Sequence, residues 1–406
     1  FTADFNDNDN IAVEKSFYQV LDFDGQYWGA NTNRGFFGDN FDILQPHWNI
    51  YAGTWTANNG ELTQTDENAT NSNIYAALNQ TLSNRYLYQF RAKVSGSGSN
   101  KRFGFHFFCD DANYTNRHNS YFIWFRVEDQ QLQFYKVVND TFTLQNTVSN
   151  VVTNTGQWYD FKITYDRVTG RIAVWRDNVY MGSWTDPSPY STNGNYISFR
   201  TGNAALNVDE LKVYRSRYPQ VTVTMGDNTK DIRYQNPNPS TFGAKIKSIV
   251  VDANNNLSSI AYHDLNVDWT PPQVFTINDG ASTDVDTVYS NSTVFANWQA
   301  AIDPNSGIQE YFYALGTTQG GTDIINWTST GQNTSITING LNLTFGNTYY
   351  FSMKAVNYAG LTSSVISSDG FTVSSLNYPM ANFSTVEDTV YLPNATVLFI
   401  NQSQNA

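Results

Sequence analysis

The stretch YFIWFRVED, residues 121–129, is followed after two residues by LQFYKVV, residues 132–138. Both runs are rich in the aromatic and β-branched residues that favour strands over helices. Successive side chains of a strand point to opposite faces, so Tyr121, Ile123 and Phe125 share a face. The two runs therefore predict neighbouring strands that each have one face in a hydrophobic core.

The same rhythm of strands and turns extends outward, from about Phe41 to Arg215. Further strand-like runs are YLYQFRAKV (86–94), WYDFKITYD (158–166), GRIAVWRDN (170–178), NYISFRTGN (195–203) and VDELKVYR (208–215). Clusters of Gly, Ser, Asn and Asp, the residues of tight turns, separate them. Strands at this spacing predict a large antiparallel sandwich in an all-β protein.

The amino-acid composition agrees with an all-β protein and excludes some classes of binding partner. The 406 residues suggest two to four domains, and aromatic residues make up 16% of them. The net charge is −13, without a basic stripe, so we expect no nucleic-acid partner and no adsorption to anionic lipid. No run of 18 apolar residues occurs, which predicts no membrane insertion. One cysteine excludes an internal disulfide and weakly favours an exported protein.

Shifts in pattern divide the chain into five predicted segments. These are a linker or tail of an upstream module (1–30), the large sandwich (31–217), a short strand-rich module (218–270), a second sandwich (271–375) and the start of another module (376–406). The last segment is too short for a domain of its own, so we expect the native protein to be longer.

Aromatic residues characterise the second sandwich. Trp298 lies in VFANWQA, Tyr311 and Tyr313 alternate in EYFYALG, and Tyr349 follows Gly346 by three residues. This pattern resembles a fibronectin type III module, which implies a core of Trp298 and the tyrosines, with Tyr349 as the tyrosine corner. The module before it resembles an Ig-like unit, and the 376–406 segment resembles the opening of a PKD-like module.

The large sandwich resembles another family. WNIYAGTWTANNGELTQTD (48–66) and VDELKVYR (208–215) are similar to the first and last strands of concanavalin/laminin-G-like jelly rolls. The whole series, with DIRYQN and IKSIVVDANNNLS, resembles the C-terminal module array of large secreted proteins of gliding bacteria. Those proteins are often labelled amidase-like or xanthan-lyase-like. The resemblance implies type IX secretion and an extracellular or outer-surface location.

One stretch contains residue types that could form a metal site or supply a nucleophile. RFGFHFFCDD, residues 102–111, contains the single cysteine, a histidine and two aspartates. Read as a strand, it directs Phe103, Phe105 and Phe107 to the core, and Cys109 falls on the same side. A buried structural cysteine is therefore favoured over a nucleophile or a metal ligand.

The opposite face of these strands carries polar and aromatic residues. We predict a ligand-binding face formed by Arg102, His106, Trp124, Arg126, Tyr135 and Arg200, with Lys162 nearby. Aromatic rings stack on the C–H faces of sugars, and Arg forks bind hydroxyls or carboxylates. The alternative is a solvated face or a face that packs against another domain.

Catalytic motifs are missing from the sequence. A glycosidase needs two carboxylates, and the E-x-D-x-x-E run of concanavalin-like hydrolases does not occur. G-x-S-x-G and zinc-ligand spacings are also lacking. We expect no catalytic residues in this segment.

Calcium is the metal that the sequence favours, because hard oxygen donors are abundant. The jelly-roll resemblance implies one structural calcium that clamps the terminal strands, with Asp209 on the last strand as a ligand. Asp4 and Asp7, in the acidic stretch DFNDNDN, are the further candidates. Turn formation and capping are the competing roles for such aspartates.

Together these observations predict a non-catalytic segment of a secreted, cell-surface multidomain protein. Its jelly roll would bind a polysaccharide or cell-wall glycan and be carried on Ig-like spacer modules. One alternative is a structural or adhesive surface stalk that associates with itself or with neighbouring proteins. Another is part of a cell-wall or polysaccharide-degrading enzyme whose catalytic domain lies upstream.

Overall fold

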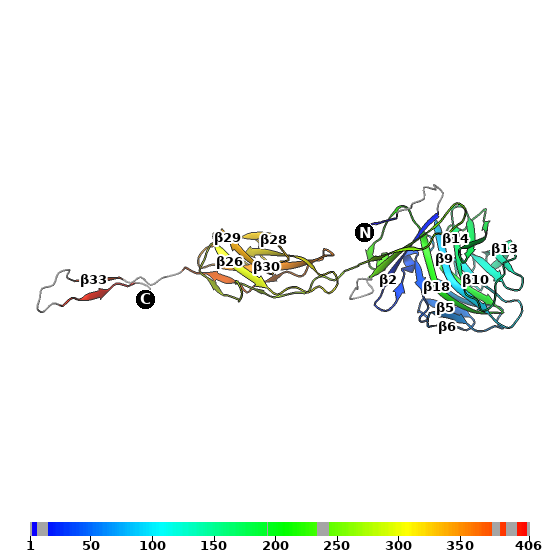
Figure 1. The fold of residues 1–406 in the computed structure, drawn as a ribbon, viewed down its shortest axis with the longest axis horizontal. Helices are drawn as coiled ribbons and strands as arrows, with labels where there is room; N and C mark the ends of the chain where they lie inside the picture. Colours follow the sequence, from blue (N-terminus) through cyan, green and yellow to red (C-terminus); the bar gives the residue numbers. More distant parts are fainter. Residues whose placement is uncertain are drawn as a thin grey trace. The chain divides into compact units, whose positions relative to one another are not determined.

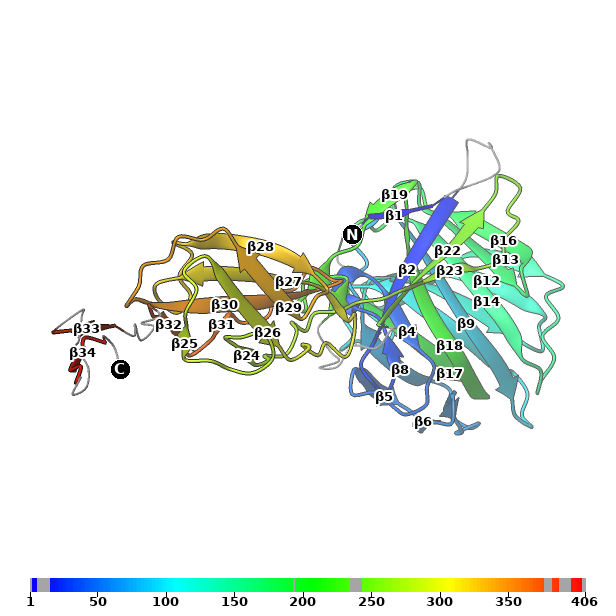
Figure 2. The same cartoon turned by 60° about the vertical axis from the view of Figure 1, so that its left-hand side comes forward.

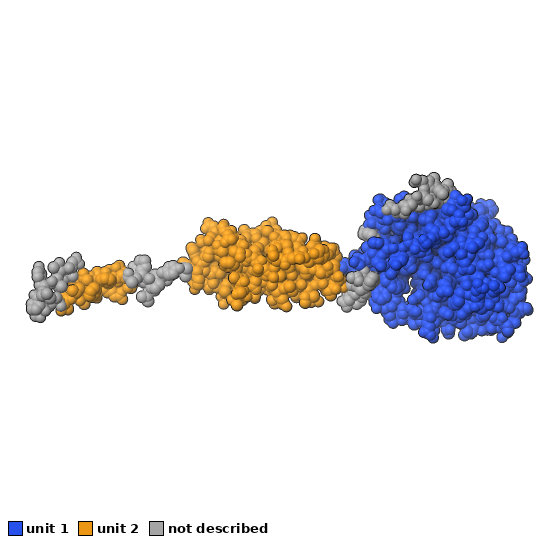
Figure 3. All heavy atoms as spheres, viewed as in Figure 1, with its two compact units in different colours: residues 1–268 blue, residues 269–406 orange. Residues whose placement is uncertain are grey.

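The computed structural model describes residues 2–5, 15–192, 194–233, 243–375, 382–386 and 396–403. It divides into two compact units, residues 1–268 and 269–406, which are distinguished by colour in Figure 3. The described residues form strands and loops with one short 3-10 helix, Thr32–Arg34, and no α-helix, which confirms the all-β class. Within these ranges no helix is long and apolar enough to cross a membrane.

The first unit is a jelly-roll sandwich of two large sheets, whose strands can be followed in Figures 1 and 2. We call one the front sheet. In spatial order it comprises β13 (Thr141–Ser149), β12 (Gln131–Val138), β11 (Ser120–Arg126), β10 (Arg102–Cys109), β17 (Tyr196–Gly202), β8 (Ser72–Ala77) and β5 (Trp48–Ala52). All its neighbouring pairs are antiparallel.

The other large sheet is the back sheet. Its main path is β16 (Val179–Thr185), β15 (Arg171–Arg176), β14 (Tyr159–Asp166), β9 (Arg85–Ser95), β18 (Ala205–Ser216), β2 (Lys15–Phe23), β22 (Ala244–Val251) and β23 (Ala261–Leu265). Side branches are β3 (Trp28–Gly29), β4 (Phe37–Asp39), β6 (Trp55–Asn58) and β7 (Glu61–Gln64). Two small pairs complete the unit, β1 (Thr2–Asp4) with β19 (Gln220–Thr222) and β20 (Met225–Gly226) with β21 (Ile232–Arg233).

The core between the two sheets is largely aromatic. Phe103, Phe105 and Phe107 of β10 are buried in it, as their alternation predicts. Ring centroids of Phe90 and Phe105 lie 5.2 Å apart, and those of Phe103 and Phe161 5.6 Å apart, so the sheets meet through edge and tilted ring contacts. Burial raises the pKa of the Cys109 thiol well above its usual value, which keeps it protonated.

The segment predicted as a separate module, 218–270, contributes to the first sandwich instead. Strand β22 pairs with β2 over eight residues and extends the back sheet. Phe17, Trp175 and Ile249 form a second apolar cluster on the outer side of that sheet. The limit between the compact units falls at residues 268 and 269, close to the expected start of the second sandwich. Strand β2 likewise places residues 15–23 of the predicted tail inside the jelly roll.

The second unit contains a smaller sandwich. One sheet has the order β24 (Ile277–Asn278), β26 (Thr293–Trp298), β29 (Ser335–Asn339). The other contains β25 (Thr287–Val288), β32 (Phe371–Val373), β30 (Thr348–Asn357), β27 (Ile308–Gly316) and β28 (Ile325–Gly331), with β31 (Ile366–Ser367) paired to β30. Trp298, Tyr311, Tyr313 and Tyr349 are buried in its core. The hydroxyl of Tyr349 accepts a hydrogen bond from Thr344 N at 2.9 Å, the bond expected of a tyrosine corner.

Part of the predicted PKD-like start, 376–381, 387–395 and 404–406, lies outside the described residues. The remainder forms an antiparallel pair, β33 (Phe383–Thr385) with β34 (Phe399–Asn401).

Candidate ligand-binding face of the front sheet

Register in the front sheet brings the predicted polar residues together. Arg102 lies opposite Arg126, and Gly104 lies opposite Trp124 on one side and Arg200 on the other. Because alternate residues share a face, these side chains lie on the surface that faces away from the core. Tyr135 and His106 join them through the neighbouring pairs of the same sheet. All six predicted ligand-binding residues therefore lie on one face, here called the front face.

Lys162 is not part of this face. It belongs to β14 of the back sheet, where its ammonium contacts the Asp160 carboxylate and Asn178. The expectation that it lies near the other residues was wrong, because sequence runs show strand faces but not which sheet a strand joins.

His106 is fully buried beneath the front face. Its ring stacks on Phe122 at 4.1 Å, and its Nδ1 lies 3.2 Å from the hydroxyl of Ser120. Burial, together with the charges of Arg200 and Arg117, holds the pKa of His106 well below its usual value. The imidazole is therefore neutral at pH 7 and acts as a support for the surface.

Trp124 is also covered, with only 7% of its surface exposed. The guanidinium carbons of Arg102 and Arg200 lie 5.8 and 5.9 Å from its ring centroid, within the range of cation–π attraction. These two arginines are partly exposed. A ligand approaching the front face would meet guanidinium groups first, with the indole beneath them.

A residue that the sequence did not reveal lies directly beneath this surface. Arg117, in the loop Asp110–Asn119, is fully buried although it carries a charge. Its guanidinium lies between the rings of Tyr51 and Tyr75, at 4.7 and 5.0 Å from their centroids. Its Nη1 donates to two carbonyl oxygens of its own loop, at 2.7 and 2.9 Å. A lone arginine within a ten-residue turn carries no periodicity that could have indicated this position.

The charges on the front face are poorly compensated. Within the described ranges, no carboxylate lies within 4.0 Å of Arg102, Arg117 or Arg200, whereas Arg126 pairs with Asp129. Burial, followed by the charges of Arg117 and Arg102, lowers the pKa of Arg200 to about 10. The chain as a whole carries a net charge of −13, so this cationic surface stands out.

Some polar atoms of the face have no hydrogen-bond partner. They are Nη2 of Arg117, Nε of Arg200 and Nε2 of His106, each shielded from solvent. A buried polar atom without a hydrogen-bond partner is energetically unfavourable, by about 1–3 kcal/mol. An anionic or hydroxyl-rich ligand supplies acceptors of the kind that Arg donors bind.

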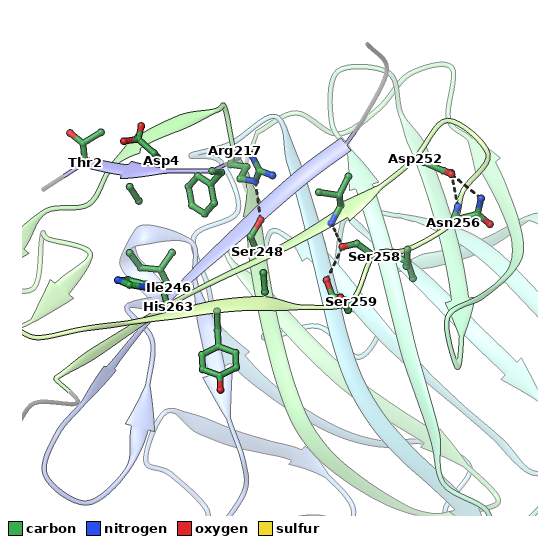
Figure 4. A pocket seen from close by; sticks show the side chains of 16 residues that line it. Thr2, Asp4, Arg217, Ile246, Ser248, Asp252, Asn256, Ser258, Ser259 and His263 are labelled. Atoms are coloured by element: carbon green, nitrogen blue, oxygen red, sulfur yellow. Dashed lines mark hydrogen bonds between the residues drawn. The ribbon is translucent and has the colours of Figure 1, made fainter. Parts of the chain in front are cut away.

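A different part of the first unit holds a hollow of about 880 Å³, drawn in Figure 4. It lies among β1, β22, β23 and the turn 252–259. Arg217 donates to the hydroxyl of Ser248 at 2.9 Å, and the Asp252 carboxylate accepts the backbone N–H groups of Asn254 and Asn256. In this described lining no hydrogen bond joins His263 to a serine.

The predicted calcium ligands of the jelly roll do not converge in the described residues. Asp209 faces Arg91, with 3.5 Å between its Oδ2 and Nη1, and Asp4 lies in the short strand β1. Asp7 lies outside the described residues. A group of three aspartates in the second unit, Asp279, Asp284 and Asp369, could hold a metal ion.

Comparisons with known proteins give a resemblance of fold only. No family model and no curated protein matches the chain. Among solved structures, the carbohydrate binding module CBM66 from Bacillus subtilis is similar, at 14% identity and a TM-score of 0.35, over 41% of this chain and 93% of that one. The carbohydrate recognition domain of Emp47p matches at 12% identity and a TM-score of 0.37, over 47% and 98%. A β-glucanase from Bacillus licheniformis matches at 12% identity and a TM-score of 0.34, over 45% and 99%.

Proposed function

We propose that this chain is a non-catalytic carbohydrate-binding segment whose front face binds an acidic polysaccharide. The observation that carries the proposal is the pair of partly exposed guanidinium groups, Arg102 and Arg200, that have no carboxylate partner within the described residues. The buried Arg117 adds its positive charge from beneath them. Uncompensated arginines on a protein of net charge −13 favour an anionic ligand.

The chemistry of the face suits sugars that carry carboxylate or sulfate groups. A guanidinium binds a carboxylate or sulfate through two parallel hydrogen bonds, and its remaining N–H groups bind hydroxyls. Tyr51 and Tyr135 are partly exposed at the same surface, where their rings can pack on the C–H faces of pyranoses. Binding would combine charge recognition at the arginines with apolar contact at the tyrosines.

We further propose that the segment belongs to a secreted, cell-surface multidomain protein. In this proposal the second unit acts as a spacer of the fibronectin type III kind, and the ligand is a polysaccharide or cell-wall glycan. The acidic composition and the single cysteine support an extracellular location.

A second candidate function is a structural or adhesive stalk, including self-association or contact with neighbouring surface proteins. The burial of His106 and Trp124 favours it, because these residues already have protein partners. In a third candidate the segment serves an enzyme whose catalytic domain lies upstream, and the front face then holds that enzyme's polysaccharide.

The test is isothermal titration calorimetry of the full chain with matched acidic and neutral polysaccharides. Peptidoglycan is included as a cell-wall glycan. The double variant Arg102→Gln/Arg200→Gln should bind the acidic polymer at least about tenfold more weakly, since a charged hydrogen bond contributes about 1.5–3 kcal/mol. Arg91→Gln makes the same type of charge change on the back sheet and should bind normally. Equal binding by the double variant would overturn the assignment of the site to the front face. Absence of binding by the unaltered chain would favour the stalk.

A further inference from the structure

Three carboxylates of the second unit converge, two from one loop and one from a segment about 85 residues farther along the chain. Asp279 follows β24, Asp284 lies in the same loop, and Asp369 precedes β32. One carboxylate oxygen from each lies within 4.8 Å of the other two. Like charges repel at such distances, and a cation between the three carboxylates would relieve that repulsion.

Hydrogen bonds hold this cluster in place. The N–H of Asp279 donates to Oδ1 of Asp284 at 2.8 Å, and Val285 N donates to the carbonyl of Asp279 at 2.8 Å. These two bonds close the loop from 279 to 285. Gly370 N donates to Oδ2 of Asp279 at 3.0 Å, which ties in the segment that carries Asp369. The carboxylates are therefore brought together by backbone geometry.

A second, independent observation points to a ligand. Asp279 is only 1% exposed, and its Oδ1 has no hydrogen-bond partner. Throughout the described part of the chain, no Lys, Arg or His nitrogen lies within 4.0 Å of the three carboxylates. Buried carboxylates are normally paired with a cation or coordinate a metal. Here the protein supplies no cation of its own.

We propose that Asp279, Asp284 and Asp369 form a calcium site that joins the 279–285 loop to the segment before β32. Calcium takes oxygen ligands at about 2.3–2.6 Å, so two ligands of one ion lie at most about 5 Å apart, in agreement with the cluster. Its three ligands are carboxylates without His or Cys, which favours calcium over zinc.

This site is independent of the proposed glycan binding, which concerns the first unit. It also differs from the calcium that the sequence predicts at Asp209, Asp4 and Asp7. A calcium ion at this position would fix one end of the second sandwich, where short strands provide few ladder bonds. The expected result of binding is thermal stabilisation of the second unit.

The experiment uses the full chain after treatment with a chelator to remove bound metal. Isothermal titration calorimetry with calcium chloride should show binding of one ion. Calorimetric melting should show a higher transition temperature in calcium than in chelator. Magnesium should have a smaller effect, because it demands stricter octahedral geometry and dehydrates reluctantly. Absence of binding at millimolar calcium would overturn the proposal.

Variants locate the site. The double variant Asp284→Asn/Asp369→Asn should lose the calcium-dependent rise, and both positions are exposed, so the fold should be retained. Asp323→Asn removes an exposed carboxylate of the same unit that accepts hydrogen bonds from Thr317. It should melt at a lower temperature but keep the full calcium-dependent rise. A rise that persists in the double variant would assign the calcium to a different site.

Discussion

The indole Nε1 of Trp175 donates a hydrogen bond of 2.7 Å to the carbonyl oxygen of Asn255, eighty residues farther along the chain. Trp175 lies on the outer side of the back sheet and is completely buried by this contact and by Ile249 and Val251. The side chain of Asn255 also accepts a hydrogen bond from Arg171 at 2.9 Å. The segment after β18 is thus an integral cover of the jelly roll.

A truncated chain should show that the stability of the jelly roll depends on the segment after β18. Residues 31–217 alone lack β2 and β22, so Leu87, Trp175 and Tyr214 would be exposed to water. We expect that segment to aggregate or to melt well below residues 1–268 in calorimetry. In the full chain, Trp175→Ala should cost about 3–5 kcal/mol of unfolding free energy. A 31–217 segment that melts cooperatively at the same temperature as 1–268 would contradict the prediction.

Local alternation was sufficient to predict the sandwich and its core. Phe103 and Phe105 could be assigned inward because strand periodicity is a property of adjacent residues. The place of β22 beside β2 was not predictable, because it depends on a pairing between residues more than 220 positions apart. A separate module was expected there from the change in pattern near residue 218.

For the front face too, some features could be predicted from local sequence and others could not. Alternation placed Arg102, Trp124 and Arg200 on one surface, and the register confirms their proximity. Alternation could not show that the two arginines cover the indole, because rotamers and neighbouring strands decide exposure. Arg117 lies beneath the front face, in a loop whose path follows from tertiary contacts that local sequence does not encode.

Replacing Arg200 by methionine should separate binding from stability. Arg200 has no carboxylate partner in the described structure, and burial lowers its pKa to about 10, so the fold opposes its charge. Methionine supplies an apolar side chain of similar length and removes that charge, together with the cation–π contact with Trp124. Arg200→Met should therefore melt at an equal or higher temperature in calorimetry, while it binds acidic polysaccharide more weakly.

The control is Arg85→Met. Arg85 donates from Nε to the Asp166 carboxylate at 2.6 Å, and Asp166 is buried. Removing this arginine leaves a buried carboxylate without its cation, so the melting temperature should fall. If Arg200→Met fell as far as Arg85→Met, Arg200 would be a structural residue and the argument for a ligand would be weakened.

Lys247, in β22, provides a prediction about pH. Burial, followed by the charge of Lys212, lowers the pKa of its ammonium to about 8, and Glu210 and Lys245 are its other charged neighbours. The unfolded chain keeps Lys247 protonated up to its ordinary pKa of about 10.5. Between these two values the folded state binds fewer protons than the unfolded state.

Stability contributed by the half-buried Lys247 should therefore rise with pH above about 8 and be lost as pH falls through that value. Chemical denaturation at pH 7.0, 8.0 and 9.5 measures this slope. Lys247→Met should be more stable than the unaltered chain at pH 7.0, and its slope should be smaller. Lys245→Met, which instead breaks an ion pair of 3.0 Å with Asp264, should retain the slope. Equal slopes for Lys247→Met and the unaltered chain would show that Lys247 stays charged across this range.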